Sequence, residues 1–403
     1  MERRNMQSTR SPKDTSVKLF TSEAVGAPSL TQAAGALIDV LSACLVNGFG
    51  MQQVSSFTVT AGVGQITVPA ATGWERMCVI DVAGCADTSY NGEYKLTDVS
   101  ADGLRVSFPI DAPDGTVLGA AITVKLASAG WLLRFADPAT SKAVYMPGTP
   151  QWAGHCLRVE DVAGTHANVR AYESMTGVDA GFGVFPGAAQ VATATWVKAL
   201  GTARPARWLI TADERLILVA PAAGYASNVN QTSVLMRWFG RFDALNATDM
   251  HAVSISVQSG VGGVNSSALG AGCAPSSISS VQTGVYVARS VDGAEMALTG
   301  FTSLLYPYVA DSGADSVCGV ATGLGIGDLV FGHKYLRHTS SSYPRAKFPG
   351  VLHLMHSSMP AGYDGVAVDI GGRLHRLFSG AATSAGTLGG ARLCAVDIEG
   401  PWA

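Results

Sequence analysis

The chain has 403 residues with 27 Lys and Arg against 30 Asp and Glu, and only 14% of its residues are charged while 47% are hydrophobic. A net charge of −3 excludes a strong overall field that would steer the protein toward nucleic acid, so we expect no nucleic-acid partner. The length exceeds what one core usually supports, which favours several domains. The 47 Gly residues disfavour helices, and we expect a mainly β fold of small antiparallel sandwich-like or barrel-like domains with one N-terminal amphipathic helix.

Residues 1–15 contain several basic residues and are not followed by an apolar run, which is unlike a secretory signal. We expect them to form an arm that is either flexible or ordered against a neighbouring subunit. The longest apolar run, residues 33–46, is interrupted by polar residues and is shorter than the roughly 18–20 residues of a membrane span. The sequence therefore predicts no membrane span.

An N-terminal segment, residues 16–54, is expected to carry the helix at about residues 30–46. Apolar residues recur there at helical spacing, at Ala34, Leu37, Ile38, Leu41 and Leu45. Ser29 or Thr31 is the expected cap, and Asn47-Gly48 the stop signal.

Residues 55–127 are predicted to form a first β-domain. Alternating apolar and polar residues indicate strands there, at residues 57–60, 65–68, 78–81, 94–97, 104–108 and 121–126. The dipeptides Asn91-Gly92, Asp102-Gly103 and Asp114-Gly115 separate some of these runs and are typical of type I′ hairpins.

A second β-domain is expected over residues 128–225, where residues 207–210 and 215–219 indicate a hairpin. Residues 226–403 are expected to form a C-terminal β-domain with a Gly/Ser-rich loop at residues 259–280. Its predicted strands include residues 284–288, 350–354, 365–370 and 391–398.

Seven cysteines are scattered along the chain without zinc-finger spacing, at positions 44, 78, 85, 156, 273, 318 and 394. We expect buried, reduced thiols, because an odd number leaves at least one unpaired within the chain. A disulfide between Cys78 and Cys85 is an alternative that depends on strand register.

No motif in the sequence assigns a catalytic, cofactor-binding or metal-binding residue, and no cofactor is expected. His353 and His356 lie in a predicted strand and loop without a nearby acidic or Cys partner, which disfavours a metal site. Residues 323–328 are Gly-rich but lack the spacing of a phosphate-binding loop. The carboxylate pairs Glu160-Asp161 and Asp213-Glu214 point to opposite faces of a strand, and we expect them at turns or rims.

Two further sets of residues have a structural and a functional interpretation. The basic stretch is a solvated loop or a contact for an acidic neighbour or a glycan, and contains His333, Lys334, Arg337, His338, Arg345 and Lys347. The tryptophans of the middle part are expected in the core rather than on a carbohydrate-binding surface, at positions 131, 152, 196, 208 and 238.

Several segments of the chain resemble virion structural proteins of tailed bacteriophages. The similarity covers roughly residues 16–245 and is carried by residues 17–20, 37–41, 43–50, 157–161, 170–179 and 185–186. The resemblance implies a protein of the virion, located on the tail or its tip and present in several symmetric copies that contact one another and other virion proteins.

We therefore expect a non-enzymatic structural component of the tail, the tail tip or baseplate, or a fibre-associated part. The alternative is a receptor-binding module whose region after residue 226 recognises a bacterial surface glycan. A third hypothesis, an enzyme that degrades envelope polysaccharide, requires a paired acid and base that the sequence does not supply.

Overall fold

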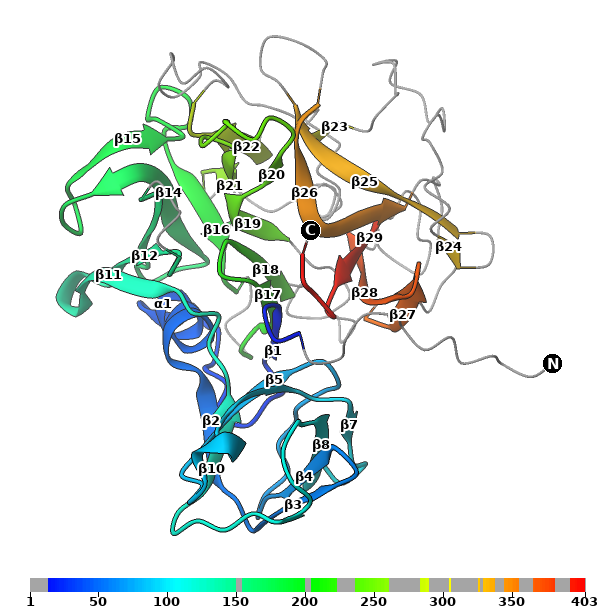
Figure 1. Ribbon diagram of the computed structural model, residues 1–403. Helices are drawn as coiled ribbons and strands as arrows, with labels where there is room; N and C mark the ends of the chain where they lie inside the picture. Colours follow the sequence, from blue (N-terminus) through cyan, green and yellow to red (C-terminus); the bar gives the residue numbers. More distant parts are fainter. Residues whose placement is uncertain are drawn as a thin grey trace.

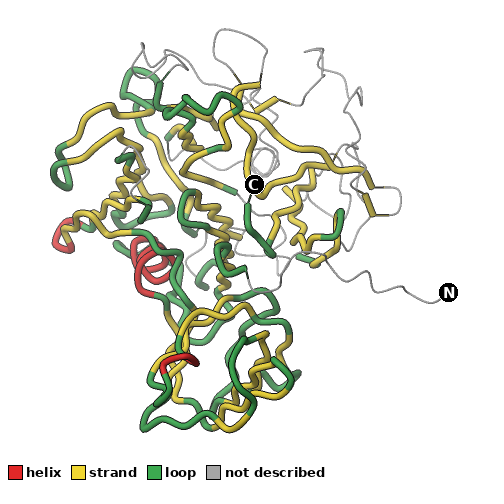
Figure 2. The backbone as a smooth tube through the Cα atoms, viewed as in Figure 1, coloured by secondary structure: helices red, strands yellow, loops and turns green. Residues whose placement is uncertain are grey.

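The computed structural model describes residues 14–149, 154–199, 204–222, 236–260, 283–289, 304–305, 325–326, 329–337, 344–354, 365–380 and 392–402. Antiparallel β-sheets make up most of this part, and the one α-helix it contains is short and lies near the N-terminus (Figures 1 and 2). The mainly β fold class expected from the composition is confirmed.

The largest sheet, here called the central sheet, has 12 strands and antiparallel pairing. Its main path runs β1-β17-β18-β19-β21-β16-β14-β13-β12-β11, while β15 pairs with β14 and β22 with β21. The strands are β1 (Lys18–Thr21), β11 (Leu132–Asp137), β12 (Lys142–Met146), β13 (Cys156–Glu160), β14 (His166–Met175), β15 (Gly181–Phe185), β16 (Ala194–Val197), β17 (Arg207–Ala212), β18 (Leu216–Ala222), β19 (Arg237–Arg241), β21 (Val253–Ser259) and β22 (Thr283–Val287).

Two smaller sheets between residues 49 and 126 form what we call the small β-unit, at the bottom of Figure 1. One sheet contains β2 (Phe49–Gln53), β10 (Thr123–Leu126), β5 (Val79–Ala83) and β6 (Gly92–Lys95). The other contains β7 (Asp98–Val99), β8 (Arg105–Pro109), β4 (Val63–Thr67), β3 (Ser56–Thr60) and β9 (Gly115–Thr116). Alternate residues of β3 and β4 are buried, as a strand with one face on a core requires.

The C-terminal sheet follows the order β23-β25-β26-β29-β28-β27. Its strands are β23 (Leu304–Leu305), β25 (Leu329–Arg337), β26 (Pro344–Leu354), β27 (Ala367–Ile370), β28 (Arg373–Gly380) and β29 (Arg392–Asp397), with β24 (Gly325–Ile326) pairing with β25. The short strand β20 (Asp243–Ala244) follows β19 and pairs with β26. The chain thus passes directly from the central sheet into the C-terminal sheet.

Two of the expected domain boundaries do not separate sheets. The boundary expected between the second and the C-terminal β-domain, at residues 225/226, falls between β18 and β19, which are neighbouring strands of the central sheet. Strand β2 lies within residues 16–54 but pairs with β10 of the small β-unit. The hairpin expected near residues 207–219 is confirmed, since β17 and β18 pair from Arg207↔Ala222 to Ala212↔Ile217.

The helix is shorter than the predicted residues 30–46. Helix α1 covers Ala36–Ser42 and continues as one π-helical turn, η1 (Ala43–Asn47). Leu30, at the start of the predicted helix, is not helical. Its carbonyl instead accepts the Ala206 N–H at 2.8 Å. The cap expected at Ser29 or Thr31 is wrong: Gly35, with φ 82°, is the N-cap residue.

The prediction of type I′ turns at the three Asn-Gly and Asp-Gly dipeptides is also wrong. Asn91 has φ −82°, and neither Asp102 nor Asp114 is among the non-glycine residues with positive φ. The turn with both central residues at positive φ lies instead at Ala61-Gly62, between β3 and β4, with φ 50° and 73°. Strand register therefore places the tight turn at Ala61-Gly62, where the local sequence gives a weaker signal.

The described tryptophans of the middle part are buried in the core, as expected, at positions 131, 196, 208 and 238. The five described cysteines are free and buried, at positions 44, 78, 85, 156 and 394, so the alternative bridge between Cys78 and Cys85 is not formed. Trp152, Cys273, Cys318, residues 1–13 and most of the Gly/Ser-rich stretch lie outside the described residues.

Candidate functional site

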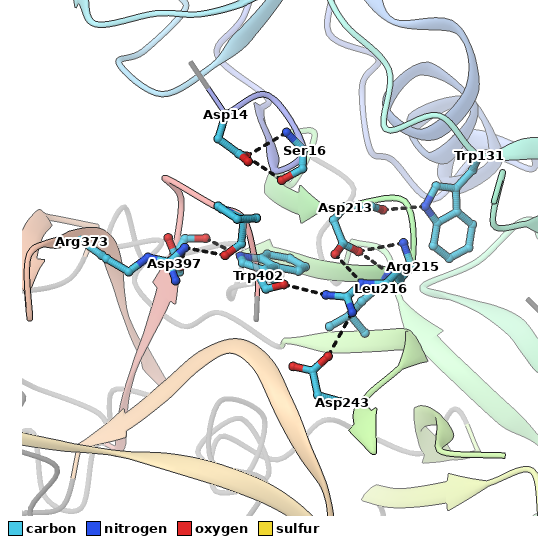
Figure 3. A network of polar contacts seen from close by, with 11 residues as sticks. Asp14, Ser16, Trp131, Asp213, Arg215, Leu216, Asp243, Arg373, Asp397 and Trp402 are labelled. Atoms are coloured by element: carbon cyan, nitrogen blue, oxygen red, sulfur yellow. Dashed lines mark hydrogen bonds and ion pairs between the residues drawn. The ribbon is translucent and has the colours of Figure 1, made fainter. Parts of the chain in front are cut away.

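The central sheet and the C-terminal sheet meet at a polar network that we call the junction (Figure 3). Its side chains come from the β17–β18 turn, from β20 and β28, and from the segment after β29. The labelled residues are Asp14, Ser16, Trp131, Asp213, Arg215, Leu216, Asp243, Arg373, Asp397 and Trp402. These positions lie far apart in the sequence, so the junction exists only in the folded chain.

Arg215 is the centre of the junction. Its Nε donates to Asp213 Oδ2 at 3.0 Å, its Nη1 to Asp243 Oδ1 at 3.0 Å, and its Nη2 to the Trp402 carbonyl at 2.8 Å. One guanidinium thus links the β17–β18 turn, strand β20 and the C-terminal segment. The planar arrangement of five donors makes Arg suited to this role.

Asp213 shapes the turn from which Arg215 projects. Its Oδ1 accepts the N–H groups of Arg215 and Leu216, both at 2.8 Å, and its carbonyl accepts Trp131 Nε1 at 2.8 Å. Burial raises the pKa of Asp213, while the Arg215 guanidinium and these N–H groups oppose that shift. The carboxylate is therefore a structural anchor of the hairpin.

The segment after β29 is held by a second carboxylate. Asp397 Oδ1 accepts the N–H groups of Glu399 and Gly400 at 2.9 and 3.1 Å, and Asp397 forms an ion pair with Arg373. The Trp402 indole donates to the Asp397 carbonyl at 2.9 Å. Trp402 lies directly over Gly350 of β26, where a Cβ atom would be 2.3 Å from the indole nitrogen. Only glycine leaves room for the ring.

Three ion pairs or hydrogen bonds attach the small β-unit to the other sheets. The buried Lys95 of β6 donates to the Glu399 carbonyl, and burial lowers the pKa of Lys95 to about 8. Lys18 of β1 forms an ion pair with Glu93, and Arg376 of β28 with Glu75. Each contact joins segments that lie at least 75 residues apart.

A separate buried ion pair fixes helix α1 to the central sheet. Lys198 Nζ lies 2.6 Å from Asp161 Oδ1, and both side chains are fully buried. Asp161 Oδ2 accepts the N–H groups of Leu37 and Ile38 at 2.6 and 3.3 Å. A residue 124 positions away in the sequence thus satisfies two free N–H groups at the start of the helix.

Both carboxylate pairs lie at turns, as expected, since Asp161 follows β13 and Asp213 lies in the β17–β18 turn, but the side chains of Asp161 and Asp213 are buried. Glu160 is half-buried beside Arg158, and Glu214 is exposed, so the two members of each pair do differ in environment. Sequence reasoning missed the buried members because the cations that neutralise them are remote or belong to the same turn.

The structure places the histidines and the residues of the basic stretch in different environments. His353 lies on β26 opposite Cys394, whereas His356 and His338 lie outside the described residues. Arg345 is buried and pairs with Asp249 at 2.7 Å, so it is not a solvated residue of a basic loop. His333 is half-buried, and burial lowers its pKa to about 4.

The Gly-rich residues 323–328 are described only at Gly325–Ile326, which form strand β24. Within the described ranges, no group of three or more His, Cys, Asp or Glu side chains is placed to hold a metal ion. The chemistry that the described polar clusters support is therefore the fixing of elements relative to one another.

Exposed apolar side chains lie on two different edge strands of the central sheet, β11 and β15, which are separated by β12, β13 and β14. Leu132 and Leu133 on β11 are 48% and 41% exposed, and Phe182 on β15 is 54% exposed. In the described part of the chain β11 pairs only with β12, and β15 only with β14. No local pattern in the sequence shows that β11 lies at an edge.

Comparison of the chain with protein-family models and with curated protein sequences finds no match. In the described residues, no helix combines the length and the apolar character needed to cross a membrane.

Proposed function

We propose that the protein is a non-enzymatic structural component of a tailed-phage virion, associated with the tail, the tail tip or baseplate, or a fibre. The proposal rests on the resemblance of residues 16–245 to such proteins and on the exposed apolar side chains at two edge strands of the central sheet. A chain whose four sheets are joined by buried polar contacts is suited to a rigid part of a particle.

Two exposed edge strands are the observation that carries the proposal. Among the described residues, β11 and β15 each pair with a strand on one side only, and they carry the exposed Leu132, Leu133 and Phe182. Such an edge is a template for pairing or packing with another chain. Neighbouring subunits in a symmetric assembly would cover it.

The direct test is to locate the chain in intact particles by electron cryomicroscopy. The proposal predicts density for several symmetric copies on the tail, with β11 and β15 facing a neighbouring subunit. Absence of the chain from purified particles would contradict the proposal. A position at the distal tip with residues 226–403 exposed would instead favour receptor binding as the main role.

A second test uses matched substitutions in the purified chain and in particles. Leu133→Glu on β11 is expected to reduce incorporation into particles by at least about tenfold, because a buried charge costs more than 1.4 kcal/mol. Leu118→Glu is the control, since Leu118 is 71% exposed on the small β-unit and away from β11. Equal incorporation of both variants, or cleavage of host glycan by the purified chain, would overturn the proposal.

A further inference from the structure

Two histidines that the preceding sites do not use lie next to each other inside the molecule. His155 is buried, and within the described part of the chain neither its Nδ1 nor its Nε2 has a hydrogen-bond partner. The same holds there for the buried Nδ1 of His251. The two ring centroids are 6.2 Å apart, with an angle of 72° between the ring planes. Buried polar atoms without partners are rare in folded proteins, and each one costs free energy.

The pair lies where two hairpins of the central sheet meet. His155 immediately precedes β13, and its ring contacts Phe185 at the end of β15 with a centroid separation of 6.2 Å. His251 lies two residues before β21. Glu173 of β14 forms an ion pair with Arg289, which follows β22. The cluster thus attaches the β14–β15 hairpin to the β21–β22 hairpin.

The charged groups that act on the two histidines come from five segments of the chain. They are Glu173 of β14, Arg241 of β19, Asp249 before β21, Arg289 after β22 and Arg345 of β26. Arg289 Nε lies 2.6 Å from Glu173 Oε1, and Arg345 Nε lies 2.7 Å from Asp249 Oδ2. Both carboxylates are therefore already engaged with arginines, and a proton on His155 would lie near Glu173, which is paired with Arg289, and near the guanidinium groups of Arg241 and Arg289.

We propose that the His155–His251 pair is an acid-sensitive joint: protonation of His155 loosens the attachment of the β14–β15 hairpin to β21 and β22. At neutral pH both rings are uncharged, and the hairpin stays attached. At acidic pH the buried imidazolium lies near Arg241 and Arg289, while the neighbouring Glu173 is already paired with Arg289, so the opened state, in which water solvates the ring, becomes favoured.

The direction of the pH effect follows from proton linkage. Burial lowers the pKa of His155 to about 4 from its ordinary value of 6.5, and the pKa of His251 is also lowered by burial. Between these two values the opened state binds more protons than the closed state, so the closed state loses stability as the pH falls from 6.5 to 4. From pH 7 to pH 4.5, one such group increases the opening equilibrium about 50-fold.

The experiment is amide hydrogen exchange of the full chain at pH 7 and pH 4.5, with rates corrected for the intrinsic pH dependence. We expect protected amides of β15 and of residues 156–158 to exchange about 50-fold faster at pH 4.5, while those of β3 and β4 change much less. Acceleration of equal size throughout the wild-type chain would overturn the proposal, whatever the variants do.

A matched pair of variants tests the role of the ring itself. His155→Phe keeps an aromatic ring but cannot be protonated, and its hairpin amides are expected to change less than about threefold between the two pH values. His375→Phe is the control, because His375 is also buried with a lowered pKa but lies on β28 of the C-terminal sheet. In His375→Phe, the amides of the β14–β15 hairpin should respond to pH as they do in the wild type. A full acid response in His155→Phe would overturn the proposal.

Discussion

Asp161 and Lys198 illustrate at the scale of single residues how this chain uses its few charges. The pair is fully buried, and Lys198 Nζ also donates to the carbonyls of Ala33 and Val162 at 2.8 and 3.0 Å. A buried ion pair is tolerated only when further hydrogen bonds satisfy its remaining atoms. Here those bonds hold the start of α1 against the β13–β14 turn.

Removal of Asp161 is therefore expected to be severe. Asp161→Ala should lower the free energy of unfolding by about 3–5 kcal/mol, because it leaves Lys198 charged and buried without a counterion. Urea denaturation measures this difference. Arg207→Ala is the control, since the Arg207–Glu23 pair is exposed, and its loss should change stability by less than about 0.5 kcal/mol. Similar losses in both variants would contradict this interpretation.

Lys95 predicts a pH dependence in the alkaline range. Its pKa is about 8 in the folded chain and 10.5 ordinarily, so the unfolded chain binds more protons between these values and stability rises as the pH increases from 8 to 10.5. The cost of burying the charge is fully present below pH 8. Lys95→Met should remove a rise of about 3 kcal/mol from the profile of unfolding free energy against pH. An unchanged profile would show that Lys95 is solvated.

At the scale of elements, the β3–β4 hairpin contains a local conflict between sequence and conformation. Ala61 has φ 50°, a left-handed conformation that costs an L-residue with a Cβ atom roughly 1 kcal/mol. Pairing of Thr60 with Val63 fixes the two-residue turn, and the buried faces of β3 and β4 fix the register. Strand packing thus overrides the preference of Ala61.

Ala61→Asn should therefore stabilise the small β-unit by about 0.5–1 kcal/mol, because Asn-Gly is favoured in a type I′ turn. Thermal unfolding measures the gain. Ala101→Asn serves as the comparison, since Ala101 is exposed in the turn before β8 and does not have positive φ. A gain of the same size at position 101 would mean that Asn acts through the unfolded chain rather than the turn.

The existence of helix α1 was predictable from the sequence, but its first residue was not. The apolar spacing correctly indicated a helix, and Leu37, Val40 and Leu41 are buried as that spacing requires. Its start was not predictable, because the acceptor for the first N–H groups is Asp161 rather than a preceding Ser or Thr. A cap supplied from a distant segment leaves no local pattern.

At the scale of the whole molecule, the segment after β29 connects all three sheet systems. Arg215 of the central sheet and Lys95 of the small β-unit both donate to its carbonyl groups, and Arg373 holds it on the C-terminal sheet. Because these contacts converge on a few residues, the sheets should behave as one cooperative unit while the segment is in place.

Trp402→Ala tests this cooperativity. Loss of the buried indole should cost about 3–5 kcal/mol and make the C-terminal sheet unfold before the central sheet, since the cavity lies between Gly350 and the junction. Calorimetry should then show two transitions instead of one. Trp402→Phe keeps most of the packing and loses the bond to the Asp397 carbonyl, so its loss should be about 1–2 kcal/mol. A single transition in Trp402→Ala would contradict the junction's role.

The sequence by itself determined the mainly β class, the positions of strands such as β3, β8 and β17, the existence of one helix and the burial of the described tryptophans of the middle part. These depend on local composition and on alternation with a period of two residues, which any chain segment displays on its own. The tertiary structure alone decided that β18 and β19 share a sheet, that β11 is an edge in the described part of the chain, and that Asp161 and Asp397 are buried anchors. Each of these depends on a partner tens to hundreds of residues away, and neither propensity nor spacing encodes which distant residue will supply the neutralising charge or the neighbouring strand.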